Sequence, residues 1–335
     1  MRQASITDVA KKAGVSIGTV SNVLNHPTRV RPATVKKVQK AILELGFVRN
    51  DAARQLKAGN STTVGLILPD ASNPFFAEVS KGAEDSANEH DYSVIIGNSS
   101  ENNDRESRYI QLFHEQRVGG VLISPVRGVA ERVAELRQMG ISSVVVDREA
   151  DPTLCCSVSM DDVAGGRLAG RHLIDIGCKH IAFVGGGPEI QQTVDRLEGL
   201  RRELGEHPEV TLSVYETDEM NVLAGRSIGE KLGELETEDR PDGVFAANDL
   251  IGVGVMQGLL FENNVRIPQE IAVIGYDDID FARSTIVPMS SVRQPAHLLG
   301  SSAVELLLSE LTDEEHVHRQ ITFQPELVVR ASSNK

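Results

Sequence analysis

Apolar residues recur with a helical period in the first 46 residues of the chain and predict three short helices. Ser5 and Asp8 have the spacing of a capping box, so the first helix is expected to begin there and to run to Ala13. Gly14 follows and predicts a tight turn instead of a longer helix. A helix, a glycine-containing turn and a second helix form the helix-turn-helix pattern, whose second helix can enter the major groove of DNA.

The two helices that follow complete this predicted module. Ser16 can cap a helix that runs to about Leu24, and Pro32 is a favoured first residue for a third helix, which is expected to end before Gly46. The outward side chains of the second helix can contact phosphate oxygens and base edges in the major groove. The predicted DNA contacts of this helix are Ser16, Ile17, Gly18, Thr19, Ser21, Asn22 and Asn25.

From residue 62 onward, short apolar runs alternate with amphipathic helical stretches. Strand–helix alternation implies parallel sheets covered on both faces, and a ligand cleft beyond the carboxyl ends of the strands. Because the runs form two series, the predicted fold is an all-α head followed by an α/β body of two Rossmann-like subdomains. The predicted strands are 64–68, 93–96, 120–123 and 143–146 in the first series, and 180–184, 213–215, 243–246 and 271–274 in the second.

The distribution of charge adds a possible partner. The 335-residue chain has a net charge of −14, which by itself argues against a nucleic-acid partner. Residues 1–59, however, hold eleven Lys and Arg against three acidic residues, a net charge of +8, whereas the remainder carries −22. A basic head on an acidic body favours DNA binding by the head alone, over the alternative of a small helical bundle with a solvated polar face.

Other features of the sequence argue against export, a membrane span and a disulfide scaffold. The amino terminus has no apolar signal core, and no stretch approaches the roughly 20 apolar residues that cross a bilayer. Cys155, Cys156 and Cys178 show no paired metal-ligand spacing and suit a reducing compartment. We therefore expect a cytoplasmic protein without a metal, a cofactor or a membrane partner.

The head resembles a known family of bacterial regulators. Residues 7–25 match the helix-turn-helix of the lactose-repressor (LacI/GalR) family, 43–50 match the end of that module, and 50–57 are similar to the family's hinge helix. The resemblance implies that Leu56 enters the minor groove of operator DNA between base pairs, which bends the duplex. It also implies a DNA-binding domain over 1–48, a hinge helix and linker over 49–61 and an effector-binding domain over 62–335. The predicted hinge contacts are Arg54, Leu56 and Lys57.

The body resembles sugar-binding periplasmic proteins, which implies a first subdomain over about 62–160 and 292–322 and a second over about 161–291 and 323–335. Planar polar side chains after the strands suit paired hydrogen bonds to sugar hydroxyls, and an apolar platform suits the C–H face of a sugar. The set resembles that of ribose-binding proteins, with Met220 where a third aromatic is common; Phe75 and Phe76 could also pack in the core. The predicted effector contacts are Asn73, Phe75, Phe76, Asp147, Arg148, Arg196, Asn248, Asp277 and Gln294.

The sequence thus predicts a homodimeric repressor of sugar uptake or catabolism genes, released from a palindromic operator by ribose or another pentose. The alternatives are the same fold responding to a nucleoside, a purine or a hexose, or using such a ligand as a co-repressor, and more distantly a freestanding sugar-binding transport protein. An enzyme is not expected. The glycines at 185–187 follow a strand, but Ile190 stands where a dinucleotide fingerprint needs glycine, and the sequence has no phosphate loop or nucleophile elbow.

Overall fold

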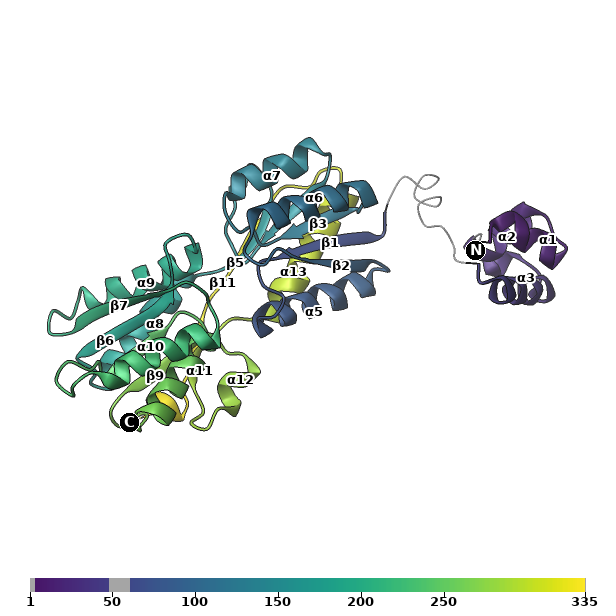
Figure 1. The fold of residues 1–335 in the computed structure, drawn as a ribbon. Coiled ribbons are helices and arrows are strands. Elements are labelled where there is room, and N and C mark those ends of the chain that lie inside the picture. The colour runs from purple at the N-terminus through teal and green to yellow at the C-terminus, as the bar shows by residue number, and fades with distance from the viewer. Residues whose placement is uncertain (1–3, 48–60, 335) are drawn as a thin grey trace. The chain divides into compact units, whose positions relative to one another are not determined.

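The computed structural model describes residues 4–47 and 61–334, which belong to a small helical head and a large α/β body divided between Ser61 and Thr62 (Figure 1). The predicted hinge contacts Arg54, Leu56 and Lys57 lie outside the described residues. None of the helices in the described ranges combines the length and the apolar character that a membrane crossing requires.

The head is the predicted helix-turn-helix with its packing helix. Ser5 Oγ accepts a hydrogen bond from the Asp8 backbone N–H at 3.3 Å, and Asp8 Oδ2 accepts one from the Ser5 N–H at 2.9 Å, which closes the capping box. Gly14 and Gly46 end helices in the left-handed conformation, with φ of 65° and 58°, which costs glycine little. The elements are α1 (Ile6–Ala13), α2 (Ile17–Asn25), η1 (Pro27–Arg29) and α3 (Pro32–Leu45). Their shared core consists of Val9, Ala10, Val20, Val23, Val38 and Ala41.

The body contains two six-stranded sheets, as the alternation of strands and helices predicts. The first sheet is parallel throughout, with the order β11-β5-β4-β3-β1-β2. Its strands are β1 (Thr63–Leu68), β2 (Ser93–Asn98), β3 (Gly120–Ile123), β4 (Ser142–Val146), β5 (Cys156–Met160) and β11 (Gln320–Phe323). Its helices are α5 (Pro74–Glu89), α6 (Asn103–Gln116), α7 (Val129–Gln138) and α13 (Ala296–Thr312). We call this part the first subdomain.

The second subdomain repeats the plan, with the strand order β12-β10-β9-β8-β6-β7, in which only β12 runs antiparallel to its neighbour. Its strands are β6 (His180–Gly186), β7 (Thr211–Thr217), β8 (Gly243–Ala246), β9 (Ala272–Asp277), β10 (Ser290–Arg293) and β12 (Glu326–Val328). Its helices are α8 (Asp162–Asp175), α9 (Gln191–Leu204), α10 (Val222–Glu234), α11 (Asp249–Gln257), η2 (Gly258–Glu262), α12 (Asp280–Ser284) and η3 (Ala331–Ser333). The predicted fold class is confirmed.

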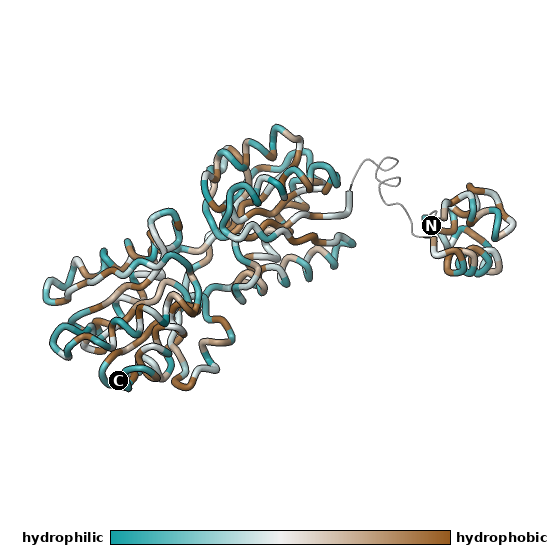
Figure 2. The backbone as a smooth tube through the Cα atoms, in the orientation of Figure 1, coloured by the Kyte–Doolittle hydropathy of each residue, from teal (hydrophilic) through white to brown (hydrophobic). Residues whose placement is uncertain are grey.

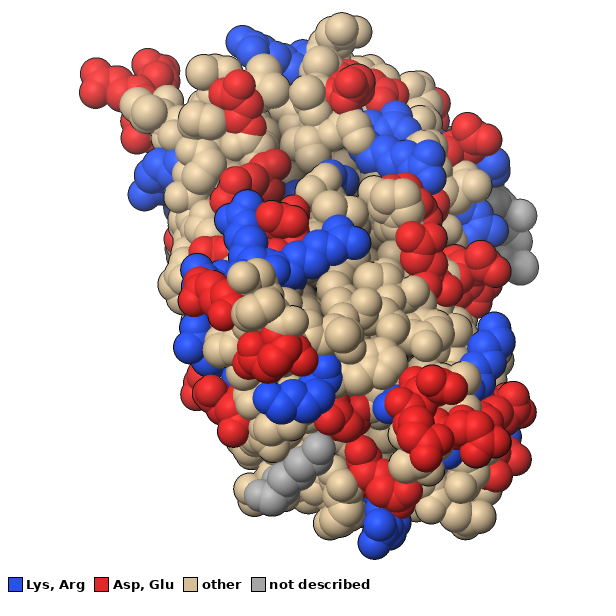
Figure 3. All heavy atoms as spheres, turned by 90° about the vertical axis from the view of Figure 1, so that its left-hand side faces the viewer, with Lys and Arg blue, Asp and Glu red and all other residues tan. Residues whose placement is uncertain are grey.

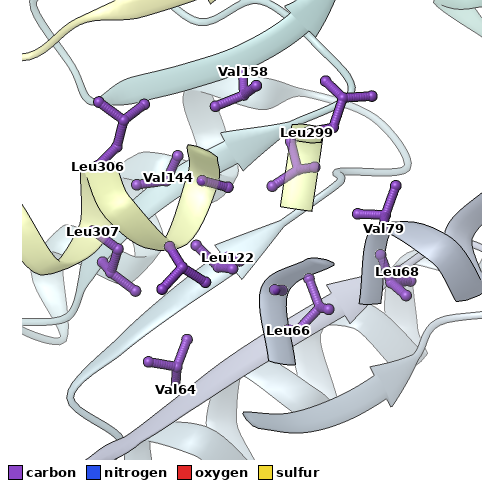
Figure 4. Close-up of a cluster of buried hydrophobic side chains, with 14 of the residues drawn as sticks. Val64, Leu66, Leu68, Val79, Leu122, Val144, Val158, Leu299, Leu306 and Leu307 are labelled. Atoms are coloured by element: carbon purple, nitrogen blue, oxygen red, sulfur yellow. The ribbon is translucent and has the colours of Figure 1, made fainter. Parts of the chain in front are cut away.

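Apolar residues concentrate along the strands and alternate with polar residues along the helices, as the hydropathy colouring of the backbone in Figure 2 shows. In the first subdomain, strand residues such as Val64, Leu66 and Val144 pack with Leu306 and Leu307 of α13 (Figure 4). Helices α5 and α13 approach so closely that a Cβ on Gly300 would lie 1.9 Å from the backbone oxygen of Val79.

The chain crosses between the subdomains at residue 161, at 294–295 and at 324–325, between strands and helices that belong to different sheets. The expected boundary at residue 292 falls inside β10, because β10 pairs with β9 as far as Arg293. The crossover therefore begins after Arg293, and Gln294 stands at the junction itself.

Candidate functional site

A cavity of about 200 Å³ lies beyond the carboxyl ends of the strands and is lined from both subdomains. Asp147 directly follows β4, Asn248 comes shortly after β8, Asp277 ends β9 and Gln294 follows β10. The carboxyl ends of parallel strands meet at one edge of a sheet, so residues far apart in sequence converge there. The predicted effector contacts that line the cavity are Asn73, Phe75, Phe76, Asp147, Arg196, Asn248, Asp277 and Gln294.

Arg148 is the predicted effector contact that this cavity does not include. Its Nη1 donates a hydrogen bond to the backbone oxygen of Pro125 at 3.2 Å, and its side chain lines a neighbouring cavity with Asp161 and Gln191. The reason is local, because successive residues after a strand project in different directions. A direct contact between Arg148 and the effector stays a prediction.

Arg196 in α9 is the buried cation of the cleft. Its Nε donates to Asp162 Oδ1 at 2.8 Å and its Nη1 donates to the backbone oxygen of Ala247 at 2.7 Å. The guanidinium lies 3.7 Å from the ring centroid of Tyr276, and Nη1 is 3.9 Å from Asp277 Oδ1. Burial opposes its charge, but the carboxylates of Asp162 and Asp277 raise the pKa of Arg196 above its ordinary value. Arg196 therefore stays charged and holds the second subdomain's side of the cleft together.

Two buried aspartates present acceptor oxygens to the cleft. Asp147 Oδ2 accepts from Gln192 Nε2 at 2.8 Å, and Asp277 Oδ1 accepts from Gln294 Nε2 at 2.8 Å. Among the described residues, Asp147 Oδ1 and Gln294 Oε1 are buried without a hydrogen-bond partner. Unpartnered buried acceptors are costly, so a ligand with hydroxyl or N–H donors would satisfy them.

Burial sets the protonation of these aspartates. It raises the pKa of both Asp147 and Asp277 to about 7, and nearby carboxylates add to the shift while Arg196 opposes it. Both also have positive φ, 62° for Asp147 and 106° for Asp277, a strained backbone conformation of the kind that gathers at functional sites.

The apolar wall of the cleft also belongs to the core. Phe75 and Phe76 open α5, and their rings meet edge-on with centroids 5.0 Å apart. Both are buried in the core of the first subdomain and both line the cavity. The same two side chains therefore pack in the core and form part of the cavity wall. Met220 lines the cavity from the second subdomain, with its sulfur 3.0 Å from the backbone nitrogen of Gly186.

The two asparagines of the site serve local structure as well. Asn73 caps α5 by accepting from the N–H of Phe75 at 3.0 Å, and Asn248 caps α11 by accepting from the N–H of Ile251 at 2.8 Å. The Asn248 amide also donates to the backbone oxygen of Met220 at 3.1 Å. Their positions are thus fixed before any ligand binds.

Some residues that line the cavity do not follow from the sequence pattern. Gln192 and Thr193 open α9 one turn before Arg196, and the Thr193 hydroxyl is buried without a partner among the described residues. The sequence signal that could identify Gln192 and Thr193 is the start of a helix after β6, because the first turn of such a helix lies at the carboxyl edge of the sheet. Further lining residues that were missed are Asp70, Glu101, Ser124, Arg127, Glu189 and Asp218.

The electrostatics of the cleft disfavour an anionic ligand. Six carboxylates line it, against two arginines, Arg127 and Arg196. Burial raises the pKa of Glu101, and the charges of Asp70, Glu219 and Glu189 raise it further. A neutral or cationic ligand with several donors fits such a cleft, and a phosphorylated ligand does not.

In the head, the second helix presents its predicted contacts unevenly. Ile17 keeps 49% of its surface exposed at the start of α2, and Asn22 is exposed beyond it. Ser16 Oγ accepts from the N–H of Thr19 at 3.1 Å as the helix cap, and the Asn25 amide donates to the backbone oxygen of Ser21 at 2.9 Å. Ile17 and Asn22 therefore present exposed side chains on this helix, while Ser16 and Asn25 also hydrogen-bond within it; contacts of these four residues with DNA stay predictions.

Comparisons with known proteins agree with this arrangement. Residues 5–50 match the pattern described as bacterial regulatory proteins, lacI family, and residues 171–333 match the periplasmic binding protein-like domain. The HTH-type transcriptional repressor PurR of Vibrio atlanticus is 33% identical over 334 residues, which is 98% of each chain.

The solved structures that share the fold include two regulators above 25% identity. The cellobiose complex of the transcriptional regulator CelR is 29% identical, covers 98% of this chain and all of its own, and has a TM-score of 0.72. A LacI family transcriptional regulator from Enterococcus faecium with bound ribose is 26% identical, covers 81% of this chain and 98% of its own, and has a TM-score of 0.72.

Proposed function

The chain belongs to the lacI family of bacterial regulatory proteins and is a DNA-binding transcriptional repressor, and on that premise we propose that a small neutral sugar in the cleft controls its operator binding. Such repressors bind operator DNA as dimers and respond to small-molecule effectors. We place its action in the cytoplasm, where the chromosomal operator lies.

The unpartnered acceptors of the cleft carry this proposal. Asp147 Oδ1 and Gln294 Oε1 lack hydrogen-bond donors, whereas Arg196 and the two asparagines carry N–H donor groups. Phe75 and Phe76 form an apolar wall. A sugar combines donor hydroxyls with an apolar C–H face. The cavity of about 200 Å³ is smaller than the roughly 300–1,000 Å³ of drug-sized sites, which favours a monosaccharide.

Among sugars we favour ribose or another pentose as an inducer. The set of side chains is similar to that of ribose-binding proteins, and the Enterococcus faecium regulator was solved with bound ribose. The second candidate is a purine base or nucleoside acting as a co-repressor. It is favoured by the PurR relatives, although Met220 offers no second aromatic face on which a flat base would stack.

A thermal-shift panel of pentoses, hexoses, nucleosides and purine bases tests this choice, because a bound ligand stabilises the folded state by mass action. We expect ribose or another pentose to raise the Tm of the full chain more than any other compound. A larger shift with a purine base would favour the second candidate. The Asp147→Asn variant should show a smaller shift with any compound that binds in the cleft.

We propose that the head contacts the operator through α2, and that the hinge contacts the operator through Arg54, Leu56 and Lys57. Asn22→Ala should weaken specific operator affinity by about tenfold and relax preference at one base pair, because one good side-chain–base pair contributes about 1–3 kcal/mol. Fluorescence anisotropy with operator duplexes measures both effects. Gln39→Ala, which alters an exposed amide on α3, is the matched control and should leave affinity unchanged. Equal losses in the two variants would contradict the assignment of Asn22.

Effector affinity should rise with pH between about 6 and 8. Hydroxyl donors favour the ionised carboxylates of Asp147 and Asp277, whose pKa is about 7 in the free protein, so binding releases protons. One pH unit below the pKa leaves about a tenth of a group ionised, so we expect a loss of about tenfold at pH 6 for each aspartate involved. Calorimetry in buffers of different ionisation enthalpy measures the released protons.

The same pKa values fix the sign of the stability change in the ligand-free protein. Both aspartates bind protons more tightly in the folded than in the unfolded protein, so their contribution to the free energy of unfolding falls as pH rises from about 4 to about 7.

The affinity prediction has its own contradicting outcome. An effector affinity that stays constant or falls from pH 6 to 8 would show that these carboxylates do not accept hydrogen bonds from the ligand.

A further inference from the structure

Three side chains with metal-binding atoms meet in the first subdomain, away from the effector cleft. Cys156 begins β5, Glu310 lies in the last turn of α13, and His316 lies in the loop that leads to β11. One ligand atom from each lies within 4.8 Å of the others. Cys156 lies far from Glu310 and His316 in the sequence, so no spacing motif in the sequence predicts this cluster.

The surrounding hydrogen bonds orient the cysteine and the histidine toward one another. Cys156 Sγ lies 3.2 Å from His316 Nε2, and His316 Nδ1 lies 3.0 Å from the hydroxyl of Ser309. A hydrogen bond on the far ring nitrogen is the device that fixes the tautomer and direction of metal-binding histidines. The backbone N–H of Arg319 also donates to Cys156 Sγ at 3.2 Å, which stabilises negative charge on the sulfur.

Glu310 supplies an acceptor that lacks a donor. Its Oε2 is buried and has no hydrogen-bond partner among the described residues. A buried carboxylate oxygen without a partner costs free energy, and a cation would remove that cost. Beside Glu310 lies a cavity of about 260 Å³, which Cys155 and His318 also line and which Cys156 and His316 do not reach.

We propose that Cys156, Glu310 and His316 bind one borderline transition-metal ion of the Zn²⁺ class, with water completing the coordination. Thiolate, imidazole and carboxylate are the ligands that Zn²⁺ takes, whereas Mg²⁺ and Ca²⁺ prefer oxygen alone. The thiolate is the ligand, so the thiol proton leaves when the metal binds. The bound ion holds the end of α13 and the following loop against the start of β5, whereas the effector cleft lies beyond the carboxyl ends of the strands.

The test uses the untagged full chain, reduced and stripped of metal with a chelator. Titration with Zn²⁺ by calorimetry should give one ion per chain, and Co²⁺ should give a thiolate-to-metal charge-transfer band with the d–d absorption of a tetrahedral site. Loss of an outer-sphere hydrogen bond typically costs 10–100-fold in metal affinity. We therefore expect about a tenfold loss for Ser309→Ala and at least about a 100-fold loss for His316→Ala.

His90→Ala is the matched control. His90 Nε2 lies 3.3 Å from Glu305 on the same helix α13, a histidine–glutamate pair that belongs to no Cys/His/Asp/Glu cluster within the described residues. This variant should keep wild-type Zn²⁺ affinity and the Co²⁺ band. His316 is only half-buried, so His316→Ala should fold, which circular dichroism verifies, even if Cys156→Ser does not. Sub-stoichiometric Zn²⁺ binding, a Co²⁺ spectrum without the thiolate band, or unchanged affinity in His316→Ala would each overturn the site.

Discussion

Replacing Arg196 with methionine should lower the free energy of unfolding by about 3–5 kcal/mol, the usual cost of removing one partner from a buried ion pair. The variant keeps most of the side-chain volume but leaves Asp162 and Asp277 buried without their cation. It also removes the stacking on Tyr276 and the hydrogen bond to Ala247. Urea denaturation followed by circular dichroism measures the change.

The loss should be smaller at pH 5 than at pH 8. Burial raises the pKa of Asp162 and of Asp277, and without Arg196 these carboxyls take up protons more readily, so the uncompensated charge disappears in acid. Arg202→Met on the same helix is the control, because its pair with Glu198 is exposed and should contribute no more than about 0.5 kcal/mol. Similar losses in both variants would show that the buried network does not hold the second subdomain together.

Asp147→Asn should weaken effector binding by about 10–150-fold while leaving operator binding and folding intact. The change is nearly isosteric, and asparagine tolerates the positive φ of this position. It replaces an acceptor oxygen that faces the cleft with an amide, and a hydrogen bond to a charged group contributes about 1.5–3 kcal/mol. Calorimetric titration of the full chain with ribose measures the loss.

The matched control for this second prediction is Asp280→Asn on α12, where 94% of the carboxylate side chain is exposed. We expect wild-type effector affinity in that variant. Asp147→Asn with unchanged effector affinity would remove Asp147 from the set of contacts. A reduced Tm without ligand in Asp147→Asn would assign the residue a structural function.

The sequence predicts most of the fold because the deciding signals are local. Ser5, Asp8 and Gly14 determine the ends of helices within a few residues, and the apolar runs of β1, β3 and β8 are long enough to identify as strands. Strands β10 and β12 were not predicted, and neither were β5 and β11. Their pairing depends on residues about 160 positions apart, and β5, with the sequence CSVSM, lacks a continuous apolar run.

The candidate site shows the same division between local and tertiary information. Asp147 and Asp277 were predicted because they follow strands, and position after a strand implies the edge of the sheet. The direction of the Arg148 side chain depends on its rotation after the strand. The rotation of α9 about its axis decides that Gln192 and Thr193 reach the cavity. The cluster of Cys156 with Glu310 and His316 arises only when β5 and α13 pack together.

Coupling between the cleft and the operator is reciprocal. A ligand that weakens operator binding must itself bind more weakly to the operator-bound protein by the same factor. We expect ribose or another pentose to bind preferentially to the form with low operator affinity. The Asp147→Asn chain should then keep high operator affinity at sugar concentrations that release the wild-type chain.

The most direct test is an anisotropy titration of a selected palindromic operator with the full-length wild-type and Asp147→Asn proteins over a range of pentose concentrations. We predict that the sugar weakens wild-type operator affinity by at least about tenfold, a typical coupling free energy of 1–3 kcal/mol, and that the Asp147→Asn protein needs about 10–150-fold more sugar for the same loss. Wild-type affinity that no pentose alters, or the same sugar dependence in both proteins, would contradict control of operator binding by a sugar in this cleft.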